Sequence, residues 1–261
     1  MTQSGYALVT GASRGLGRCF ARALAARGQN LVLVARSEAL LQTLTEELKQ
    51  TYQIEVEPIV CDLATENAGE QLADALLARN LTIDLLVNNA GGGKQGWFLE
   101  LGLRQQLDAV HLQNTTVVEL VYKLTAPMIE RGRGGIINVS SMAGWQPIPY
   151  ATIYSSAKSF LTTFSLALEA EVGPQGVAVV TLCPGHLRKS GQDVNPATDN
   201  RKAPGGDSSQ EEVVAAALRK LDEGGGLVIP GTRNKLTAFA ERFVPRRKEA
   251  RLVGKFSKPK R

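Results

Sequence analysis

Short apolar runs recur along the chain and alternate with longer segments whose apolar positions follow a helical period. Seven runs have the length and composition of strands: residues 6–9, 31–34, 54–60, 85–87, 136–139, 177–182 and 227–229. The segments between them are long enough to form helices, which is the pattern of a parallel sheet covered on both faces. We therefore predict an α/β fold with a single doubly wound parallel sheet of seven strands.

The chain changes character after residue 232. An apolar stripe of helical period follows, formed by Leu236, Phe239, Ala240 and Phe243. Pro245 is expected to end this helix. Residues 233–261 hold eleven Lys or Arg and two Glu, a net charge of +9, whereas the formal +5 of the whole chain leaves −4 on residues 1–232. We divide the chain into a main domain, residues 1–232, and a basic amphipathic tail, residues 233–261.

The tail allows more than one partner. A basic amphipathic helix binds an anionic membrane surface when its apolar side enters the headgroup region. The same stripe fits equally well against the main domain or a second subunit, with its charges in water. The sequence leaves peripheral membrane contact open beside these alternatives, and we expect no nucleic-acid partner.

Length and composition narrow the class of protein. At 261 residues and 43% hydrophobic, the chain is long enough for one α/β domain with a full core. No apolar run approaches the roughly 20 residues of a membrane span and no signal peptide is recognisable, so we expect a cytoplasmic protein. Cys19, Cys61 and Cys183 lack metal-ligand spacing and are interpreted as small core residues. His111 and His186 lack a second ligand, so we expect no catalytic metal.

A glycine-rich turn follows the first predicted strand. Residues 10–17 read Thr-Gly-Ala-Ser-Arg-Gly-Leu-Gly and precede a segment of helical composition. Glycines at 11, 15 and 17 let the backbone turn tightly and approach a pyrophosphate, which binds the free N–H groups of the following helix. A strand, a glycine turn and a helix in this order are typical of a dinucleotide site, although a tight turn without a ligand fits the same residues.

Tyr154 and Lys158 are four residues apart and therefore share one face of a predicted helix, thirteen residues after Ser141. A tyrosine with a pKa of about 10 is a poor base near pH 7, and a neighbouring positive charge lowers that pKa. A hydroxyl such as that of Ser141 then holds the substrate oxygen that gains or loses the proton. Alone, the pair Tyr154 and Lys158 also fits a solvated helix surface.

The glycine turn and the group of Ser141, Tyr154 and Lys158 belong to a longer series of motifs along the chain. The other members are Asn88-Asn89-Ala90-Gly91 after a strand, Asn114 in the next helix, and Pro184-Gly185. Together they resemble the short-chain dehydrogenase/reductase family over residues 5 to about 232, and within it the branch of 3-oxoacyl and hydroxysteroid reductases. The resemblance implies a Rossmann-type, dinucleotide-binding catalytic domain.

The resemblance also implies catalytic roles for four residues. Tyr154 is the proton donor for carbonyl reduction, or the base for alcohol oxidation, and Ser141 orients the substrate oxygen. Lys158 lowers the pKa of Tyr154 and holds the nicotinamide ribose, while Asn114 anchors a water that links Lys158 to solvent.

Further residues are implied as contacts of the dinucleotide. They are Gly11, Ser13, Arg14, Gly15, Leu16, Gly17, Arg36, Asp62, Leu63, Asn88, Ala90, Gly91, Tyr154, Lys158, Pro184 and Gly185. The predicted second strand ends at Arg36 and offers no acid for a ribose 2′-hydroxyl, whereas Arg36 and Arg14 both suit a 2′-phosphate. We therefore expect NADP(H) as the cofactor.

Three segments carry weaker expectations. Asp62 and Asp84 are expected at the carboxyl ends of strands, where ligands bind in such sheets. Residues 186–208 lack any period and are expected to close over the substrate, with an unstructured loop as the alternative. Lys189 stands where the family has a threonine that contacts the nicotinamide carboxamide, and Ser190 is a substitute for it.

We therefore expect an enzyme that reduces the ketone of a small hydrophobic molecule, either 3-oxoacyl or steroid-like, with NADP(H). Oxidation of a secondary alcohol uses the same residues in reverse and stays open. A non-catalytic NADP(H) sensor is the third alternative, disfavoured because a sensor has no need of a proton donor. Members of the family commonly pair through the helices that would hold Asn114 and Tyr154, so a homodimer or homotetramer is expected.

Overall fold

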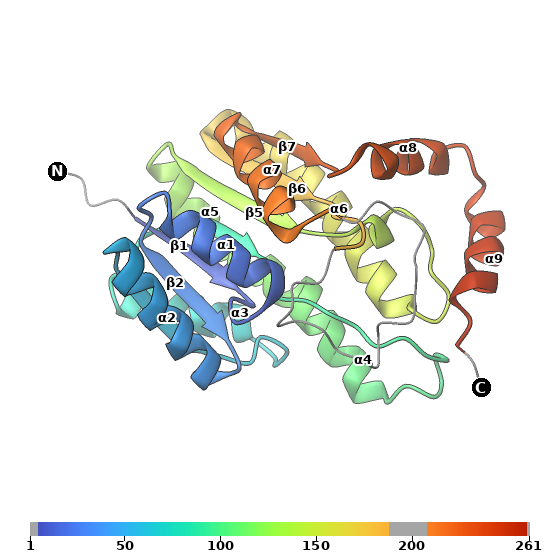
Figure 1. The fold of residues 1–261 in the computed structure, drawn as a ribbon, viewed down its shortest axis with the longest axis horizontal. Coiled ribbons are helices and arrows are strands. Elements are labelled where there is room, and N and C mark those ends of the chain that lie inside the picture. The colour runs from blue at the N-terminus through green and yellow to red at the C-terminus, as the bar shows by residue number, and fades with distance from the viewer. Residues whose placement is uncertain (1–4, 188–207, 260–261) are drawn as a thin grey trace.

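The computed structural model describes residues 5–187 and 208–259, and its centre is one parallel sheet (Figure 1). The strands are β1 (Tyr6–Thr10), β2 (Leu31–Ala35), β3 (Val56–Val60), β4 (Ile83–Asn88), β5 (Gly134–Val139), β6 (Val177–Leu182) and β7 (Gly225–Val228). They lie in the order β3-β2-β1-β4-β5-β6-β7, and every pair is parallel. The predicted doubly wound sheet of seven strands is confirmed.

Helices cover both faces of this sheet. The α-helices are α1 (Gly15–Ala25), α2 (Glu38–Tyr52), α3 (Ala68–Ala78), α4 (Leu103–Val110), α5 (Thr116–Glu130), α6 (Thr152–Val172), α7 (Gln210–Asp222), α8 (Thr232–Glu241) and α9 (Arg246–Ser257). Shorter helical turns are η1 (His111–Thr115), η2 (Met142–Gly144) and η3 (Gly173–Gln175). One core cluster joins α1, α2 and α7 to the sheet, and a second joins α3, α5 and α6 to the opposite face.

Alternation along the strands produces these two clusters. In β1, Ala7 and Val9 belong to the first cluster, while Leu8 between them belongs to the second. Because successive side chains of a strand point to opposite faces, a sheet covered on both sides needs apolar residues at every position. That requirement explains why the strands read as continuous apolar runs in the sequence. Cys183 is buried as expected, whereas Cys19 and Cys61 are half-buried beside the clusters.

The expected position of Asp84 is wrong. Strand β4 begins at Ile83, before the apolar run 85–87, so Asp84 lies near the amino end of the strand and far along it from the ligand-binding edge. Its carboxylate accepts a hydrogen bond of 3.0 Å from the Gly5 backbone and forms ion pairs with Arg131 at 3.3 Å and Arg133 at 3.5 Å. Asp84 therefore ties chain segments together at the opposite edge of the sheet.

The strand order reverses between β1 and β4, which are neighbours although β2 and β3 lie between them in sequence. In such sheets the loops that leave adjacent strands in opposite directions open a crevice at their carboxyl ends. Here those loops are the glycine turn after Thr10 and the segment after Asn88. The topology therefore brings the two nucleotide motifs of the sequence together.

The tail forms two helices rather than one. Helix α8 ends at Glu241, four residues before Pro245, and Pro245 is the N-cap of α9. Figure 1 shows both helices beyond the carboxyl edge of the sheet. The division of the chain at residue 232 stays a prediction. Most of the segment expected to cover the substrate, together with Lys189 and Ser190, lies outside the described residues.

Candidate active site

The glycine turn sits at the carboxyl end of β1 and opens directly into α1. Gly11 and Gly15 have φ angles of +65° and +51°, a region that favours glycine. Arg14 is the N-cap of α1 and supplies no capping side chain, so the first N–H groups of the helix are left for another acceptor. This is the arrangement that binds a pyrophosphate.

The Thr10 hydroxyl and the Asn89 amide hold this turn against the end of β4. The buried Thr10 Oγ1 donates to Val87 O at 3.2 Å and accepts from the backbone N–H groups of Asn89 at 2.9 Å and Ala90 at 3.0 Å. The Asn89 side chain donates to Thr10 O at 2.8 Å and to Gly11 O at 3.3 Å. Sequence reasoning missed both residues, although the doubled asparagine of the motif was a signal.

Gly17 shows how closely the turn is packed. A Cβ at this position would lie 2.2 Å from Gly11 O and 2.5 Å from the Asn89 amide nitrogen, which are distances that real Cβ atoms do not reach. The glycine triplet therefore lets α1 pack directly against the turn that precedes it. A side chain at Gly17 would push the helix away from the backbone that faces the phosphate. These residues fit a bound dinucleotide.

Several of the predicted nucleotide contacts have side chains that point elsewhere. Leu16 and Leu63 are buried in the two core clusters, so only their backbones are available to a ligand. Asn88 donates to Asn138 Oδ1 at 2.8 Å, and Asn138 in turn donates to Ser165 Oγ at 2.8 Å, so this asparagine is part of a polar chain inside the core. Its neighbour Asn89 reaches the glycine turn instead.

The positions that would meet the adenosine half are exposed. Arg36 directly follows β2 and Arg14 lies in the glycine turn, and both side chains are exposed. Asp62 follows β3 and accepts a hydrogen bond of 3.1 Å from the Ala64 backbone, which fixes its carboxylate at the end of the strand. The end of β2 therefore carries an exposed arginine and no acid, as the sequence predicted.

Tyr154, Lys158 and Ser141 converge beyond the carboxyl ends of β4 and β5. Tyr154 and Lys158 lie on α6, with the Lys158 ammonium 5.9 Å from the centre of the tyrosine ring. The ammonium is buried and donates to Val139 O at 2.8 Å. Ser141 is the N-cap of η2, where it accepts from the Ala143 backbone at 3.1 Å, and it also forms a hydrogen bond with Tyr154.

Burial controls the titration of this group of residues. It raises the pKa of Tyr154, against a smaller lowering by the hydrogen bond with Ser141. It lowers the pKa of Lys158 to about 8, against a smaller rise caused by Cys183. The expectation that Lys158 brings the pKa of Tyr154 below its ordinary value is wrong in this structure, because desolvation of the phenol outweighs the hydrogen bond. Tyr154 is therefore protonated at neutral pH.

Asn114 and Gln113 lie in η1, a turn of π-helix between α4 and α5. The amide of Asn114 donates to Ala157 O on α6 at 3.3 Å. Gln113 is only 1% exposed, and its amide nitrogen donates to Gly92 O at 2.8 Å and Ala109 O at 3.2 Å. Sequence reasoning missed Gln113, and only its position beside Asn114 pointed to it.

The nicotinamide end of the site is tied to Ser141 through the backbone. The N–H of Met142 donates to Pro184 O at 3.0 Å, which joins the loops that carry Ser141 and Pro184-Gly185. Helix α8 closes this side, because a Cβ on Gly185 would lie 2.5 Å from the amide nitrogen of Asn234. In residues 5–187 and 208–259 no group of three or more His, Cys, Asp or Glu side chains is arranged to hold a metal ion.

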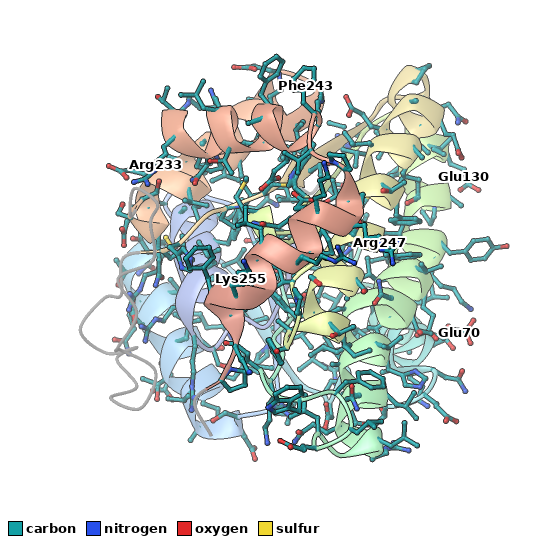
Figure 2. All side chains as sticks on the ribbon, turned by 90° about the vertical axis from the view of Figure 1, so that its right-hand side faces the viewer. Glu70, Glu130, Arg233, Phe243, Arg247 and Lys255 are labelled. Carbon is teal, nitrogen blue, oxygen red and sulfur yellow. The ribbon has the colours of Figure 1, made fainter. Side chains whose placement is uncertain are left out.

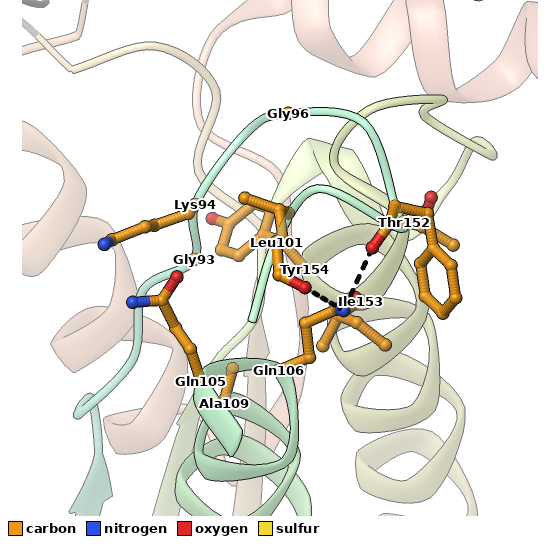
Figure 3. Close-up of a pocket in the computed structure, with 11 residues that line it drawn as sticks. Gly93, Lys94, Gly96, Leu101, Gln105, Gln106, Ala109, Thr152, Ile153 and Tyr154 are labelled. Carbon is orange, nitrogen blue, oxygen red and sulfur yellow. Dashed lines mark hydrogen bonds between the residues drawn. The ribbon is translucent and has the colours of Figure 1, made fainter. Parts of the chain in front are cut away.

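A pocket opens beside Tyr154 (Figure 3). Its lining is mostly apolar and includes Phe98, Leu101, Ala109 and Ile153, with Lys94 on one wall. Gln106 braces the wall by donating to Phe98 O and Leu101 O, both at 3.1 Å. The enclosed space is small, about 20 Å³, which is room for roughly one water molecule, so the pocket marks an apolar surface beside Tyr154.

Two segments flank this pocket and hold each other. Gly96 N donates to Tyr150 O at 2.8 Å, and the Trp97 and Tyr150 rings meet edge to face with centroids 4.9 Å apart. Tyr150 has a φ of +66°, a strained value for a bulky residue. The tail covers the same segments, because Gln95 donates to Ser257 O at 2.9 Å and Arg246 donates to Trp145 O.

Comparison with known proteins places this geometry in a family. Residues 5–198 match the short chain dehydrogenase family. The very-long-chain 3-oxoacyl-CoA reductase of Bos taurus is 31% identical over 220 residues, which are 83% of this chain and 68% of that protein. The chain spans about 58% to 68% of the length of the curated relatives of this kind that it matches.

Solved structures agree in fold. The short-chain dehydrogenase from Sphingobium yanoikuyae, in complex with NADPH, has a TM-score of 0.79 and 28% identity and covers 91% of this chain and 93% of its own. A 7beta-hydroxysteroid dehydrogenase has a TM-score of 0.84 and 25% identity, with coverage of 95% and 96%. With the sheet order, the glycine turn and the group of Ser141, Tyr154 and Lys158, these matches show that the chain belongs to the short-chain dehydrogenase family, whose members are NAD(P)-dependent oxidoreductases.

Proposed function

We propose that this protein reduces the ketone of a hydrophobic substrate, a 3-oxoacyl or steroid-like molecule, to a secondary alcohol with NADP(H). The observation that carries the proposal is the phenol of Tyr154, hydrogen-bonded to Ser141 and kept protonated by burial, beside a mostly apolar pocket. A reductase needs a proton donor at this place, because the carbonyl oxygen gains a proton as the carbon gains a hydride.

The residues of the chain divide the work of that reaction. NADPH supplies the hydride when it is bound. The hydroxyls of Ser141 and Tyr154 donate hydrogen bonds to the carbonyl oxygen and stabilise the negative charge that develops on it. Tyr154 then gives up its proton, and the positive charge of Lys158 stabilises the phenolate that remains. We propose Asn114 as a support of this group, since its amide holds the backbone of α6 next to Lys158.

NADP(H) is favoured over NAD(H) by the end of β2. Arg36 and Arg14 are exposed where a 2′-phosphate would lie, and a guanidinium makes a charge-assisted fork with phosphate. A structural neighbour with 28% identity was solved with NADPH, which supports the same choice.

The substrate class rests on the pocket and on the names of relatives. Phe98, Leu101 and Ile153 present apolar side chains beside Tyr154, around a cavity of about 20 Å³ that must widen to admit a substrate. Relatives named 3-oxoacyl-CoA reductase and hydroxysteroid dehydrogenase support a large hydrophobic ketone. Oxidation of the corresponding alcohol is the alternative activity, and the protonated state of Tyr154 at neutral pH favours reduction instead.

We also propose that two or four copies of the chain assemble through α5 and α6. Large apolar or aromatic side chains are exposed on both helices, with Tyr122 79% and Phe160 43% exposed. Such residues are often buried between subunits. Within the described part of the chain, no helix has the length and apolar character needed to cross a bilayer. We propose a cytoplasmic enzyme that contacts a membrane peripherally through its tail.

Replacement of Tyr154 by Phe tests the reaction. The ring and its packing remain, while the proton donor is lost, so NADPH should bind with unchanged affinity and turnover of a panel of hydrophobic ketones should almost vanish. NADPH absorbance measures turnover and fluorescence measures binding. Turnover at the wild-type rate in the variant would refute the role of Tyr154, and an intact enzyme without activity on any ketone would favour the sensor alternative.

A further inference from the structure

We propose that the outer face of α8 docks the enzyme on an anionic membrane surface. The face is formed by Leu236 and Phe239 on α8 and continues in Phe243 and Val244 of the turn that follows it; we call these four residues the outer stripe. This inference deepens the peripheral contact proposed above and rests on it, but it is independent of the reaction that the active site performs.

The orientation of α8 leaves the outer stripe exposed, without a partner among residues 5–187 and 208–259. The opposite side of the helix is buried, with Asn234 at 8% and Ala238 at 3% exposure, and Asn234 lies against Gly185. Leu236, Phe239 and Phe243 are 65%, 59% and 74% exposed. At about 100° per residue, Leu236 lies roughly 160° around the helix from Ala238. Figure 2 shows Phe243 projecting from the outer end of this helix.

Basic side chains border the outer stripe. Arg233 lies on one side of it, Lys235 and Arg242 lie on the other, and all three are exposed. Arg247 and Lys248 at the start of α9 add further exposed charge. An apolar stripe between two rows of cations is the pattern of a helix that lies in the headgroup region of an anionic bilayer, where the apolar side chains enter the acyl boundary and the cations meet phosphate.

The same charges disfavour a second copy of the chain as the occupant. A twofold contact through the outer stripe would bring the Arg233, Lys235 and Arg242 side chains of two subunits close together, and like charges across an interface oppose association. Helix α8 also touches the active site through Asn234 and Gly185, so docking would hold the pocket close to a bilayer in which a hydrophobic ketone dissolves.

Co-sedimentation of the full chain with vesicles tests the proposal. Vesicles of phosphatidylcholine mixed with phosphatidylserine should carry the enzyme down, vesicles of phosphatidylcholine alone should carry less, and high salt should release it. The double variant Phe239→Ser/Phe243→Ser should lose most of the sedimenting fraction. Leu77→Ser is the matched control, because Leu77 is 77% exposed on α3 and should leave binding unchanged.

Reduction of a water-soluble ketone by the same variants separates this proposal from the proposed function. Both variants should keep wild-type turnover, so loss of vesicle binding alone is attributed to the stripe. Equal sedimentation of wild type and double variant would overturn the proposal. A change from dimer to monomer in the double variant, measured by analytical ultracentrifugation, would show that the stripe is a subunit interface and would overturn it as well.

A different observation assigns a positioning role to Gln113. We infer that its amide oxygen, through one water molecule, holds the ammonium of Lys158 in its charged form beside Tyr154. This inference rests on the proposed reaction.

The hydrogen bonds of Gln113 fix which way its amide faces. The nitrogen donates to two carbonyl oxygens, Gly92 O and Ala109 O, so the oxygen must point the other way. That oxygen is buried and has no hydrogen-bond partner among the described residues. It lies 3.3 Å from the place where a Cβ on Gly91 would be, and Lys158 Nζ lies 3.3 Å from the same place.

The Gln113 amide oxygen and Lys158 Nζ are therefore no more than twice 3.3 Å apart, a gap that one water can bridge. Lys158 has three protons and gives one to Val139 O, so the others are available to such a water. An acceptor that faces an ammonium favours its charged form, and it opposes the burial that lowers the pKa of Lys158. The neighbouring Asn114 uses its amide nitrogen to hold Ala157 O of α6, so the two side chains support this group from different contacts.

The pH dependence of kcat/KM separates positioning from simple packing. Gln113→Leu removes the acceptor, so the alkaline limb of ketone reduction should move to lower pH and turnover at neutral pH should fall about tenfold. Gln113→Glu keeps an acceptor and adds charge, so the limb should move to higher pH. It also serves as the test if the leucine variant does not fold.

Thr125→Val is the control, because Thr125 is another buried polar side chain, 7% exposed on α5, and it should leave the limb in place. An unchanged limb in both Gln113 variants would overturn the inference. That outcome is distinguishable from failure of the proposed function, in which Tyr154→Phe would retain turnover.

Discussion

The glycine turn makes the sharpest prediction, the effect of Gly17→Ala. The new methyl group would lie 2.2 Å from Gly11 O and 2.5 Å from the Asn89 amide nitrogen. Ordinary contacts at such atoms begin above 3.0 Å, so α1 or the turn must move by about 1 Å. A displacement of about 1 Å at a site of this kind costs roughly a hundredfold, which corresponds to about 2.7 kcal/mol of binding.

We therefore expect Gly17→Ala to weaken NADPH binding about a hundredfold, and to lower the free energy of unfolding by about 1–3 kcal/mol through overpacking. Fluorescence titration with NADPH measures the first quantity and urea unfolding the second. Gly28→Ala is the matched control, because Gly28 has a φ of +74° and no atom within 4 Å of its Cβ position. It should lose about 1–2 kcal/mol of stability and keep full affinity for NADPH. Wild-type affinity in Gly17→Ala would refute the assignment of this turn to the dinucleotide.

Three further predictions follow from charged groups. Burial lowers the pKa of Lys158 to about 8, so kcat/KM for reduction should fall as pH rises through about 8 and the ammonium loses its proton; a flat profile from pH 7 to 9 would contradict this. Arg36→Asp should lower kcat/KM with NADPH by about tenfold to a hundredfold and favour NADH, while the same charge change at the exposed Arg79 should have no effect. Burial and then Glu249 raise the pKa of Glu241 to about 7, above its unfolded value, so the protonated form stabilises the fold at low pH and that stabilisation is lost as pH rises through about 7. Glu241→Gln should therefore raise Tm at pH 8 more than at pH 5. An equal change at both pH values would contradict the raised pKa of Glu241.

The alternating strands and helices were predictable because every strand of this sheet is buried on both faces. Continuous apolar runs located all seven strands, and their ends shifted by only a few residues where polar or glycine residues join a strand, as at Asp84 and Gly225. Asp84 directly precedes the predicted run 85–87, so its place at the amino end could be read from the sequence, whereas its contacts with Gly5, Arg131 and Arg133 could not. Strand ends depend on such tertiary contacts more than on local pattern.

The sequence predicted which types of residue form the site, but it did not always identify which of two neighbouring residues reaches it. Neighbours in a sequence can face opposite directions, and here the second asparagine of residues 88 and 89 reaches the glycine turn while the first joins the core. Gln113 was also missed, because only the fold brings its amide oxygen and Lys158 Nζ to the same distance from the Cβ position of Gly91. The pKa of Tyr154 was also beyond the sequence, because desolvation depends on everything packed around the ring.

The polar chain of Asn88, Asn138 and Ser165 has a consequence for engineering. It braces β4, β5 and α6 from within, and these three elements carry the nucleotide loop, Ser141 and Tyr154. The walls of the pocket come mainly from residues 93–109, together with Thr152, Ile153 and Tyr154 at the start of α6. Libraries confined to residues 93–109 should therefore yield altered selectivity without loss of hydride-transfer competence, whereas changes at the start of α6 would also disturb Tyr154.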